Sequence, residues 1–488
     1  MQERSGATMP EHSGTAMRAL FDETDATGLA DAIRRRDVHP REVLEHALAR
    51  LDERNPVLNA VVARCDDAAL AQVDAGLPDA PFAGVPFVVK DLGMTVAGLP
   101  ATGGSRLFAG VVATRDTELV TRYRRAGFVV IGTTNTPELG RNPSTEPLLH
   151  GPTRNPHDLR RSPGGSSGGT AAAVAAGIVP IGHGNDGGGS IRIPASACGL
   201  VGLKPSRGRT TTLPKLTTLS YPLGINHVLT RSVRDTARVL DLTAGGLPGE
   251  PFAIAPPERP YADEVGRDPG RLRIGLLRAM PDGRPLHPDV AAVVDDAAAL
   301  VASLGHDVEP DAPVIPLDAV SAAMRAFMSA PLVVDVDARL AELGRELRDD
   351  DLEPMTRMIY EDGRNLRAAD LVRAAQQAER AGREVGAWFS SHDVLLTATL
   401  ALPAPPLGLL DTTNLAAMRE HAAAYSVMTA FANVTGQPAI SLPLGHDRDG
   451  VPVGVQLVAA NGREDVLVRL AAQIEAARPW PITPVWNP

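Results

Sequence analysis

The chain has 488 residues, of which 44% are hydrophobic but only 3% aromatic, and its formal net charge at pH 7 is −10. This apolar content is enough for a sizeable core. No cluster of Lys and Arg accompanies the acidic balance, which argues against nucleic acid as a partner, because clustered basic side chains are what hold a phosphate backbone. Two cysteines, Cys65 and Cys198, are too few for the disulfide framework of small secreted proteins.

The first 20 residues are polar and without periodicity, so we expect a disordered tail rather than a signal peptide, which needs an apolar core. The longest run of small apolar residues, 170–182, is shorter than the ~20 residues that cross a bilayer. We therefore expect a cytoplasmic protein without a membrane partner, in which residues 21–488 form a single catalytic domain.

Apolar patterns with helical and strand periodicity alternate along the chain. After two amphipathic helices, strands are predicted at 82–90, 128–131, 178–181, 272–277, 394–396, 439–442 and 453–458. Helices are predicted at 116–126, 170–176, 231–244, 288–304, 317–345, 353–388, 414–432 and 463–477. This alternation indicates an α/β fold. The helical segment at about 317–390 is expected to pack over the substrate side.

Two short motifs in the Gly-rich centre of the chain suggest other kinds of site. Gly182, Gly184 and Gly187 have the spacing of a dinucleotide-binding loop, but that loop requires a helix opening at the third glycine, and Pro194 follows too soon. Residues 165–169 match the G-x-S-x-G nucleophile elbow centred on Ser167. That elbow needs a strand directly before it, whereas the preceding residues are NPHDLRRSPG.

A longer set of motifs resembles the amidase signature family. GGSSGG at 164–169 is followed by a second Gly-rich loop ending in Ser190-Ile-Arg and by SACGLVGLKP at 196–205. Upstream lie GVPFVVKD at 84–91 and GTTNTPE at 132–138, and downstream lie GQPAISLP at 436–443 and GVQLV at 454–458. The resemblance spans about residues 28–480. It implies the amidase signature fold, in which a central, mixed, twisted sheet is covered by helices on both faces.

The resemblance also implies a Ser–cis-Ser–Lys triad that uses no metal and no cofactor. Ser190 would be the nucleophile, Ser166 the bridging serine after a cis peptide bond, and Lys90 the base. Lys90 ends an apolar strand, where burial would disfavour its charged form. The backbone N–H groups of Gly187, Gly188, Gly189 and Ser190 would form the oxyanion hole, because consecutive glycines let neighbouring amides converge on one anion.

Other residues are expected to support this site. Asp186 and Arg192 bracket the glycine loop and are predicted to fix its shape, although a surface ion pair is the alternative. Ser167 is a supporting hydrogen-bonding residue, and Arg141 lies in a loop expected to contribute to substrate binding. His183 and Cys198 are interpreted as core residues.

The loop sequence departs from the commoner family pattern. The family has Ser/Thr-Asp-Thr/Ile-Gly-Gly-Ser, where this chain has Asn185-Asp186-Gly-Gly-Gly-Ser190. Glycine at position 187 is expected to widen or loosen the acyl pocket.

Within the family, the motifs at 145–147 and 151–156 resemble bacterial amidases of the 6-aminohexanoate cyclic-dimer hydrolase, aryl acylamidase and urethanase type. The resemblance implies a hydrolase that cleaves amide bonds of small, aryl or oligoamide substrates, and carbamates and esters by the same acyl-enzyme route. One alternative is a glutamine amidotransferase A-type subunit that needs a partner protein, and another is an inactive binding protein on the same fold. The chain is expected to be a monomer or a homodimer.

Overall fold

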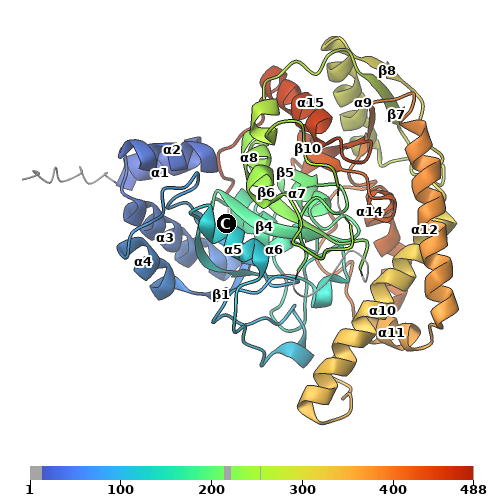
Figure 1. Ribbon diagram of the computed structural model, residues 1–488, viewed down its shortest axis with the longest axis horizontal. Coiled ribbons are helices and arrows are strands. Elements are labelled where there is room, and N and C mark those ends of the chain that lie inside the picture. Colours follow the sequence, from blue (N-terminus) through green and yellow to red (C-terminus); the bar gives the residue numbers. More distant parts are fainter. Residues whose placement is uncertain (1–13, 214–220, 253, 487–488) are drawn as a thin grey trace, which may run out of the picture.

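One mixed β-sheet runs through the computed structural model, which describes residues 14–213, 221–252 and 254–486 (Figure 1). In the described residues the sheet has eleven strands in the order β1-β3-β2-β4-β6-β5-β10-β11-β9-β7-β8. β2 is parallel to β3 and β4, whereas β10 is antiparallel to β5 and β11. The strands are β1 Val61–Arg64, β2 Pro86–Lys90, β3 Val129–Thr134, β4 Ile181–Asp186, β5 Val201–Lys204, β6 Ile225–Thr230, β7 Arg273–Leu277, β8 Asp307–Glu309, β9 Val394–Ala398, β10 Ala439–His446 and β11 Pro452–Ala459.

Helices cover both faces of this sheet, which confirms the predicted α/β fold. They are α1 Gly14–Glu23, α2 Ala26–Arg35, α3 Pro40–Leu58, α4 Asp66–Asp74, α5 Glu118–Arg125, α6 Gly168–Ala175, α7 Arg192–Cys198, α8 Val233–Thr243, α9 Pro288–Ser303, α10 Leu317–Leu343, α11 Pro354–Arg364, α12 Ala368–Trp388, α13 Leu415–His421, α14 Ala430–Thr435 and α15 Glu464–Ala477. Short 3₁₀ turns lie at Arg106–Phe108, Glu138–Gly140, Tyr261–Glu264 and Ala422–Tyr425.

The alternation of side chains along each strand explains the two covered faces. In the half of the sheet around β2, Val88 and Ile131 pack in one cluster with residues of α3, α4, α6 and α7. Phe87, Val89 and Val130 point the other way and pack with residues of α2, α5 and α8. Because Lys90 has the same parity as Val88, it points toward the face that carries α6.

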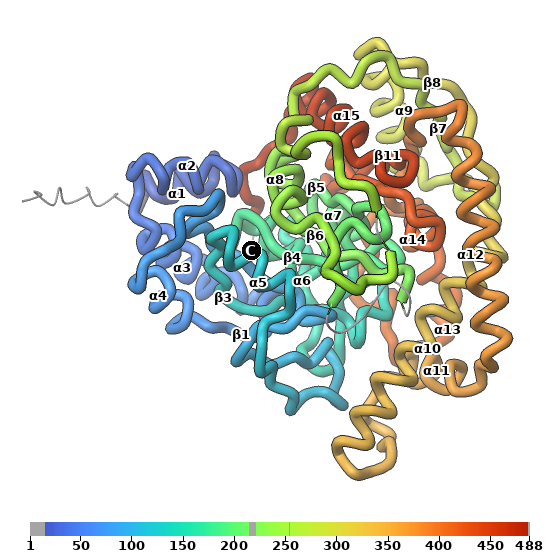
Figure 2. The backbone as a smooth tube through the Cα atoms, viewed as in Figure 1, coloured from blue at the N-terminus to red at the C-terminus, as the bar shows by residue number. Residues whose placement is uncertain are grey.

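In the other half of the sheet, α8, α9 and α15 pack on one face of β9, β10 and β11. Residues of α10, α12 and α14 pack on the opposite face, against Leu395, Ala439 and Val458. The long helices α10 and α12 lie side by side along one flank of the molecule, where the connection from α10 to α11 projects away from the sheet (Figure 2). This helical layer is the segment predicted at 317–390.

The functional residues gather where parallel strands end. β2 and β4 run in the same direction, so their carboxyl ends, Lys90 and Asp186, lie at the same edge of the sheet. This edge is where ligand sites of open α/β sheets form.

The N-terminal segment differs from the expectation. Residues 14–20, predicted as part of a disordered tail, belong to α1. Met17 and Phe21 are buried in a small cluster with α2 and α3, and their four-residue spacing places both on one helical face. The rest of the predicted tail, residues 1–13, lies outside the described residues.

Other elements differ in their limits. The helix predicted at 353–388 is two helices, α11 and α12, and the strand predicted at 178–181 begins three residues later as β4. β1, β5, β6 and β8 were not predicted at all.

Helix α10 is long and apolar enough to cross a membrane by length and composition alone. In this fold its apolar residues instead serve internal packing: Val320, Ala323 and Phe327 are buried against residues of α12 and α14.

Candidate active site

Lys90 is completely buried at the end of β2. Its Nζ lies 2.6 Å from Ser166 Oγ and 2.6 Å from Asn185 Oδ1. Burial lowers the pKa of Lys90 well below its usual value of 10.5, and the negative charge of Asp186 opposes this only in part. The site therefore favours the neutral amine, which has a lone pair available to accept a proton.

Asn185 holds the amine of Lys90 in place beside Ser166. Asn185 Nδ2 donates to the carbonyl oxygen of Leu92 at 2.7 Å, so Oδ1 is the atom that faces Lys90. A neutral amine that donates one N–H to Asn185 Oδ1 can direct its lone pair at the Ser166 hydroxyl. Lys90 Nζ donates to Ser166 Oγ in this structure, and the neutral amine has a lone pair that can accept the Ser166 proton along the same contact.

Ser166 and Ser190 share one cavity, which we call the catalytic cavity. The peptide bond between Gly165 and Ser166 is cis. Ser166 is buried and Ser190 is half-buried, and both line the cavity together with Met324 and Met328 of α10 and Met355 of α11. Ser190 Oγ forms no hydrogen bond with any described residue, which leaves this hydroxyl available to a bound molecule.

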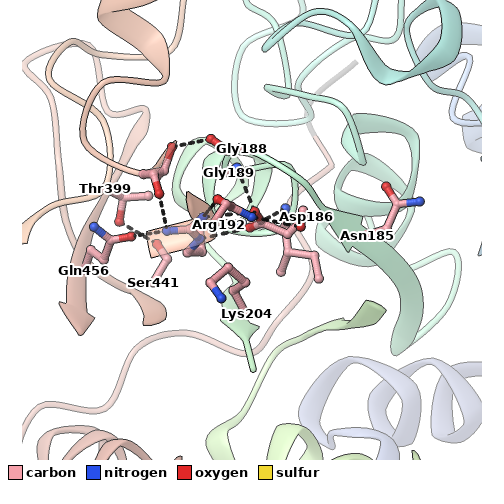
Figure 3. A network of polar contacts seen from close by, with 12 residues as sticks. Asn185, Asp186, Gly188, Gly189, Arg192, Lys204, Thr399, Ser441 and Gln456 are labelled. Carbon is pink, nitrogen blue, oxygen red and sulfur yellow. Dashed lines mark hydrogen bonds and ion pairs between the residues drawn. The ribbon is translucent and has the colours of Figure 1, made fainter. Parts of the chain in front are cut away.

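A buried ion pair holds the loop that carries Ser190. Asp186 and Arg192 are both fully buried, and two parallel bonds of 2.9 Å join them (Figure 3). The remaining guanidinium N–H groups donate to Thr429 O, Gln456 Oε1 and Asn433 Oδ1. Burial by itself would raise the pKa of Asp186, but the attraction of Arg192 outweighs it and keeps this pKa below its usual value. Asp186 is therefore a charged anchor in the core.

The same carboxylate also binds the loop backbone. The N–H groups of Gly189 and Ile191 donate to Asp186 at 2.7 and 3.2 Å, and Thr429 Oγ1 donates to the Gly188 carbonyl at 2.7 Å. The Gly189 N–H, which the sequence analysis includes in the oxyanion hole, is thus engaged in holding the loop. Within the described part of the chain, the N–H groups of Gly187, Gly188 and Ser190 donate to no protein group.

Gly187 does not leave the open space that the sequence analysis expects. A Cβ atom at this position would overlap the hydroxyl oxygen of Tyr221. Gly224 also lies against this ring: a Cβ atom at position 224 would be 2.6 Å from two carbons of the Tyr221 ring. Tyr221 Oη donates to Met328 Sδ at 3.1 Å. The room freed at position 187 is filled by Tyr221, which forms part of the cavity wall.

The structure does not support either of the two other motifs found in the sequence, the G-x-S-x-G elbow and the dinucleotide-binding loop. No strand precedes Ser167 in residues 141–166, and Ser167 Oγ donates to the Asn185 carbonyl at 3.2 Å. Gly182 and Gly184 lie within β4, and the next helix begins only at Arg192. His183 is fully buried, and burial lowers its pKa to about 3. In the described ranges, no group of three His, Cys, Asp or Glu side chains lies close enough together to hold a metal ion.

Comparison with known proteins gives the family. A family model described as Amidase matches residues 42–468. The chain belongs to the amidase family. It is 39% identical over 476 residues to the 6-aminohexanoate-cyclic-dimer hydrolase of Paenarthrobacter ureafaciens. The aligned region covers 93% of this chain and 95% of that relative.

Two solved structures resemble this amidase closely. A 6-aminohexanoate cyclic dimer hydrolase in complex with its substrate has a TM-score of 0.90 at 36% identity and covers 96% of this chain and 100% of its own. A bacterial aryl acylamidase of the amidase signature family has a TM-score of 0.85 at 26% identity, with coverages of 95% and 99%. The predicted family is thus confirmed, and the chain is a hydrolase that acts on amide bonds. These relatives do not favour the amidotransferase subunit.

Sequence reasoning missed two residues of the amidase site. Asn185 stands inside the recognised loop, but its contact with Lys90 depends on β4 continuing to residue 186, and the predicted strand ended at 181. Because successive side chains of a strand point to opposite faces, a longer predicted strand would have placed Asn185 and Asp186 on opposite faces. Figure 3 shows Asn185 pointing away from Arg192. Tyr221 lies 34 residues beyond Gly187 in a segment with no motif, so no local signal indicates it.

We expect the substitution Asp186→Asn to destabilise the protein by about 3–5 kcal/mol, because it leaves the Arg192 guanidinium buried without a counter-charge. The urea midpoint of unfolding measures this. A control is Asp289→Asn, which breaks a pair with the exposed Arg448 and should lower the midpoint far less. Equal losses in the two variants would contradict the anchoring role of Asp186.

A second prediction concerns the contact between Gly187 and Tyr221. Gly187→Ala should lower kcat/KM for an amide substrate at least about tenfold, since its methyl group displaces Tyr221 or the loop. Tyr221→Phe in the same chain should restore most of this loss, because the new Cβ then lies 3.4 Å from ring atom Cζ, an ordinary contact.

Gly188→Ala is the matched control for that pair, since its Cβ meets only the flexible end of Met324 at 3.0 Å. Tyr221→Phe should not rescue Gly188→Ala. Equal rescue of both alanine variants would show that Tyr221 acts by another route.

Proposed function

We propose that this amidase hydrolyses compact amides through an acyl-enzyme formed on Ser190, with Ser166 and Lys90 as the proton relay. The observation that carries the proposal is the buried Lys90 Nζ, which lies 2.6 Å from Ser166 Oγ, while Ser166 lines the same cavity as Ser190. A lysine kept neutral by burial can act as a base near neutral pH, where an exposed lysine is protonated.

In the first half of the reaction, Ser190 Oγ attacks the amide carbonyl carbon. Its proton passes to Ser166 Oγ, while the Ser166 proton passes to Lys90 Nζ. The N–H groups of Gly187, Gly188 and Ser190 are the proposed donors to the oxyanion, because no protein group occupies them. The relay then returns a proton to the amide nitrogen, the C–N bond breaks, and the amine leaves.

In the second half, water attacks the Ser190 ester. The same relay removes a proton from the water and returns one to Ser190 Oγ as the acid is released. The attack and the oxyanion concern only the carbonyl group, so aryl esters and aryl carbamates are included among the proposed substrates. The methionine side chains at the cavity wall suit substrates with apolar chains, because they adapt to varied shapes.

Ser190→Ala should abolish hydrolysis of a p-nitroanilide, lowering kcat by a factor of about 10³ or more, as expected when a nucleophile is removed. Release of p-nitroaniline at 405 nm measures the rate. Ser167→Ala tests the competing elbow hypothesis and should retain kcat within about tenfold, because Ser167 Oγ donates to a backbone carbonyl rather than facing a substrate.

A covalent probe separates the same alternatives. Phenylmethanesulfonyl fluoride should add its sulfonyl group to Ser190 itself, as located by fragmentation of the labelled peptide in mass spectrometry. Modification at Ser167, or activity that survives in Ser190→Ala, would refute the proposed nucleophile.

We expect kcat/KM to rise with pH and to level off, with a midpoint well below 10.5, because only the deprotonated fraction of Lys90 accepts a proton and that fraction grows as pH rises. A pH–rate profile from 6 to 10 tests this. The buried His183 and His227, whose pKa values burial lowers to about 3, titrate too low to produce such a limb.

Lys204 provides the control, because it is a second buried lysine whose pKa burial lowers to about 7. Its Nζ donates to the Pro205 carbonyl and, among the described residues, forms no hydrogen bond with Ser166 or Ser190. Lys204→Met should keep the rising limb. If the limb vanishes in this variant, the titrating base is not Lys90.

A further inference from the structure

Arg141 lies in the wall between the catalytic cavity and a second cavity. The second one, which we call the side cavity, is lined by Asp91, Thr102, Phe108, Asn226, Pro331 and Asp335. Arg141 lines both cavities, as do Leu139, Gly187 and Tyr221. Arg141 therefore lines the cavity that also contains Ser190.

Among the described residues, the Arg141 guanidinium has no hydrogen-bond or ion-pair partner. The side chain as a whole is half-buried, and its Nε and Nη1 are shielded from solvent without forming a hydrogen bond. By contrast, every N–H group of Arg192 has an acceptor. A guanidinium stays charged in proteins, so an unpaired buried one is costly unless another molecule supplies the acceptor.

The backbone around Arg141 holds the side chain in this position. The preceding turn contains Leu139 at φ +47°, a conformation that non-glycine residues rarely adopt. Glu138 fixes the turn by accepting from Ser105 Oγ at 2.7 Å and from the Glu353 N–H at 2.8 Å. Strained backbone conformations that buried hydrogen bonds maintain are concentrated at functional sites, and this one lies next to Arg141.

The charged and titratable groups that face Arg141 do not neutralise it. Burial lowers the pKa of Arg141, whereas the electrostatic interactions with Tyr221 and Asp335 raise it in part. Burial also raises the pKa of Tyr221, so its phenol is neutral near pH 8. Asp335 lines the side cavity, as do Asp91 and Asp186, and forms no ion pair with Arg141 among the described residues.

We infer that the preferred substrates of this amidase carry a carboxylate, remote from the scissile amide, that binds Arg141. The inference rests on the proposed function and adds the chemical class of the substrate. A carboxylate matches the planar N–H fork of a guanidinium with two parallel bonds and also compensates its charge, which a second amide carbonyl does not. The apolar wall of Met324, Met328 and Met355 suits the chain that joins the two ends.

The test compares matched acidic and neutral substrates at pH 8, where the carboxylates are ionised. Glutaric acid mono-p-nitroanilide is paired with pentanoyl-p-nitroanilide, which places the acid on the acyl side. The pair 4-(butyrylamino)benzoate and butyranilide places it on the amine side. The wild-type protein should favour the acidic member of at least one pair in kcat/KM.

Arg141→Met should lower that acidic-to-neutral ratio about tenfold or more, as expected for loss of a charge-assisted bond. The ratio is insensitive to the fraction of folded protein, because both substrates are measured on one preparation. Asp335→Asn is a control of opposite sign and should raise the ratio, since it removes a negative charge from the side cavity.

Glutarate should also inhibit the wild-type protein competitively more strongly than pentanamide does. A wild-type preference for the neutral member of both pairs, or equal losses on both members in Arg141→Met, would overturn the inference. Those outcomes leave the proposed mechanism intact if hydrolysis still depends on Ser190. Hydrolysis that persists in Ser190→Ala would instead refute the mechanism.

Discussion

The buried pair of Asp186 and Arg192 joins segments that are more than 240 residues apart. Asp186 ends β4 and Arg192 begins α7, while the acceptors Asn433 and Gln456 belong to α14 and β11. A guanidinium with all its N–H groups occupied has a single orientation, and the carboxylate it holds binds the glycine loop in turn. The position of Ser190 therefore depends on the completed sheet rather than on its own short loop.

The positive charges of Arg192, Lys90 and Arg141, which lie away from bulk solvent, are compensated in three different ways. Arg192 keeps its charge and is fully paired, which makes it a structural anchor. Lys90 has no carboxylate partner among the described residues, and burial favours its neutral form, which the proposed base requires. Arg141 stays charged and has no partner in the described part of the chain, so the proposal takes the compensating charge from the substrate. The choice between Lys and Arg at these positions thus determines their chemistry.

The sequence predicts most of this architecture, because the relevant signals are local. The apolar strand before Lys90, the two Gly-rich loops and the order of the motifs lead to the fold and to the triad hypothesis. What it does not predict depends on contacts between distant segments. The amide of Asn185 is oriented by Leu92, and the space at Gly187 is filled by Tyr221. Helix α1 was missed because it directly follows a polar segment without periodicity; in the structure, Met17 and Phe21 pack in a buried cluster with other helices.

The packing of Tyr221 between Gly187 and Gly224 also bears on how the cavity can be redesigned. A library that varies position 187 alone will mostly yield damaged proteins, because every side chain larger than hydrogen collides with the phenol. Paired libraries at 187 and 221 avoid this barrier, since a smaller residue at 221 creates the volume that a larger one at 187 requires. Among natural relatives, the same exchange would appear as correlated side-chain sizes at the two positions.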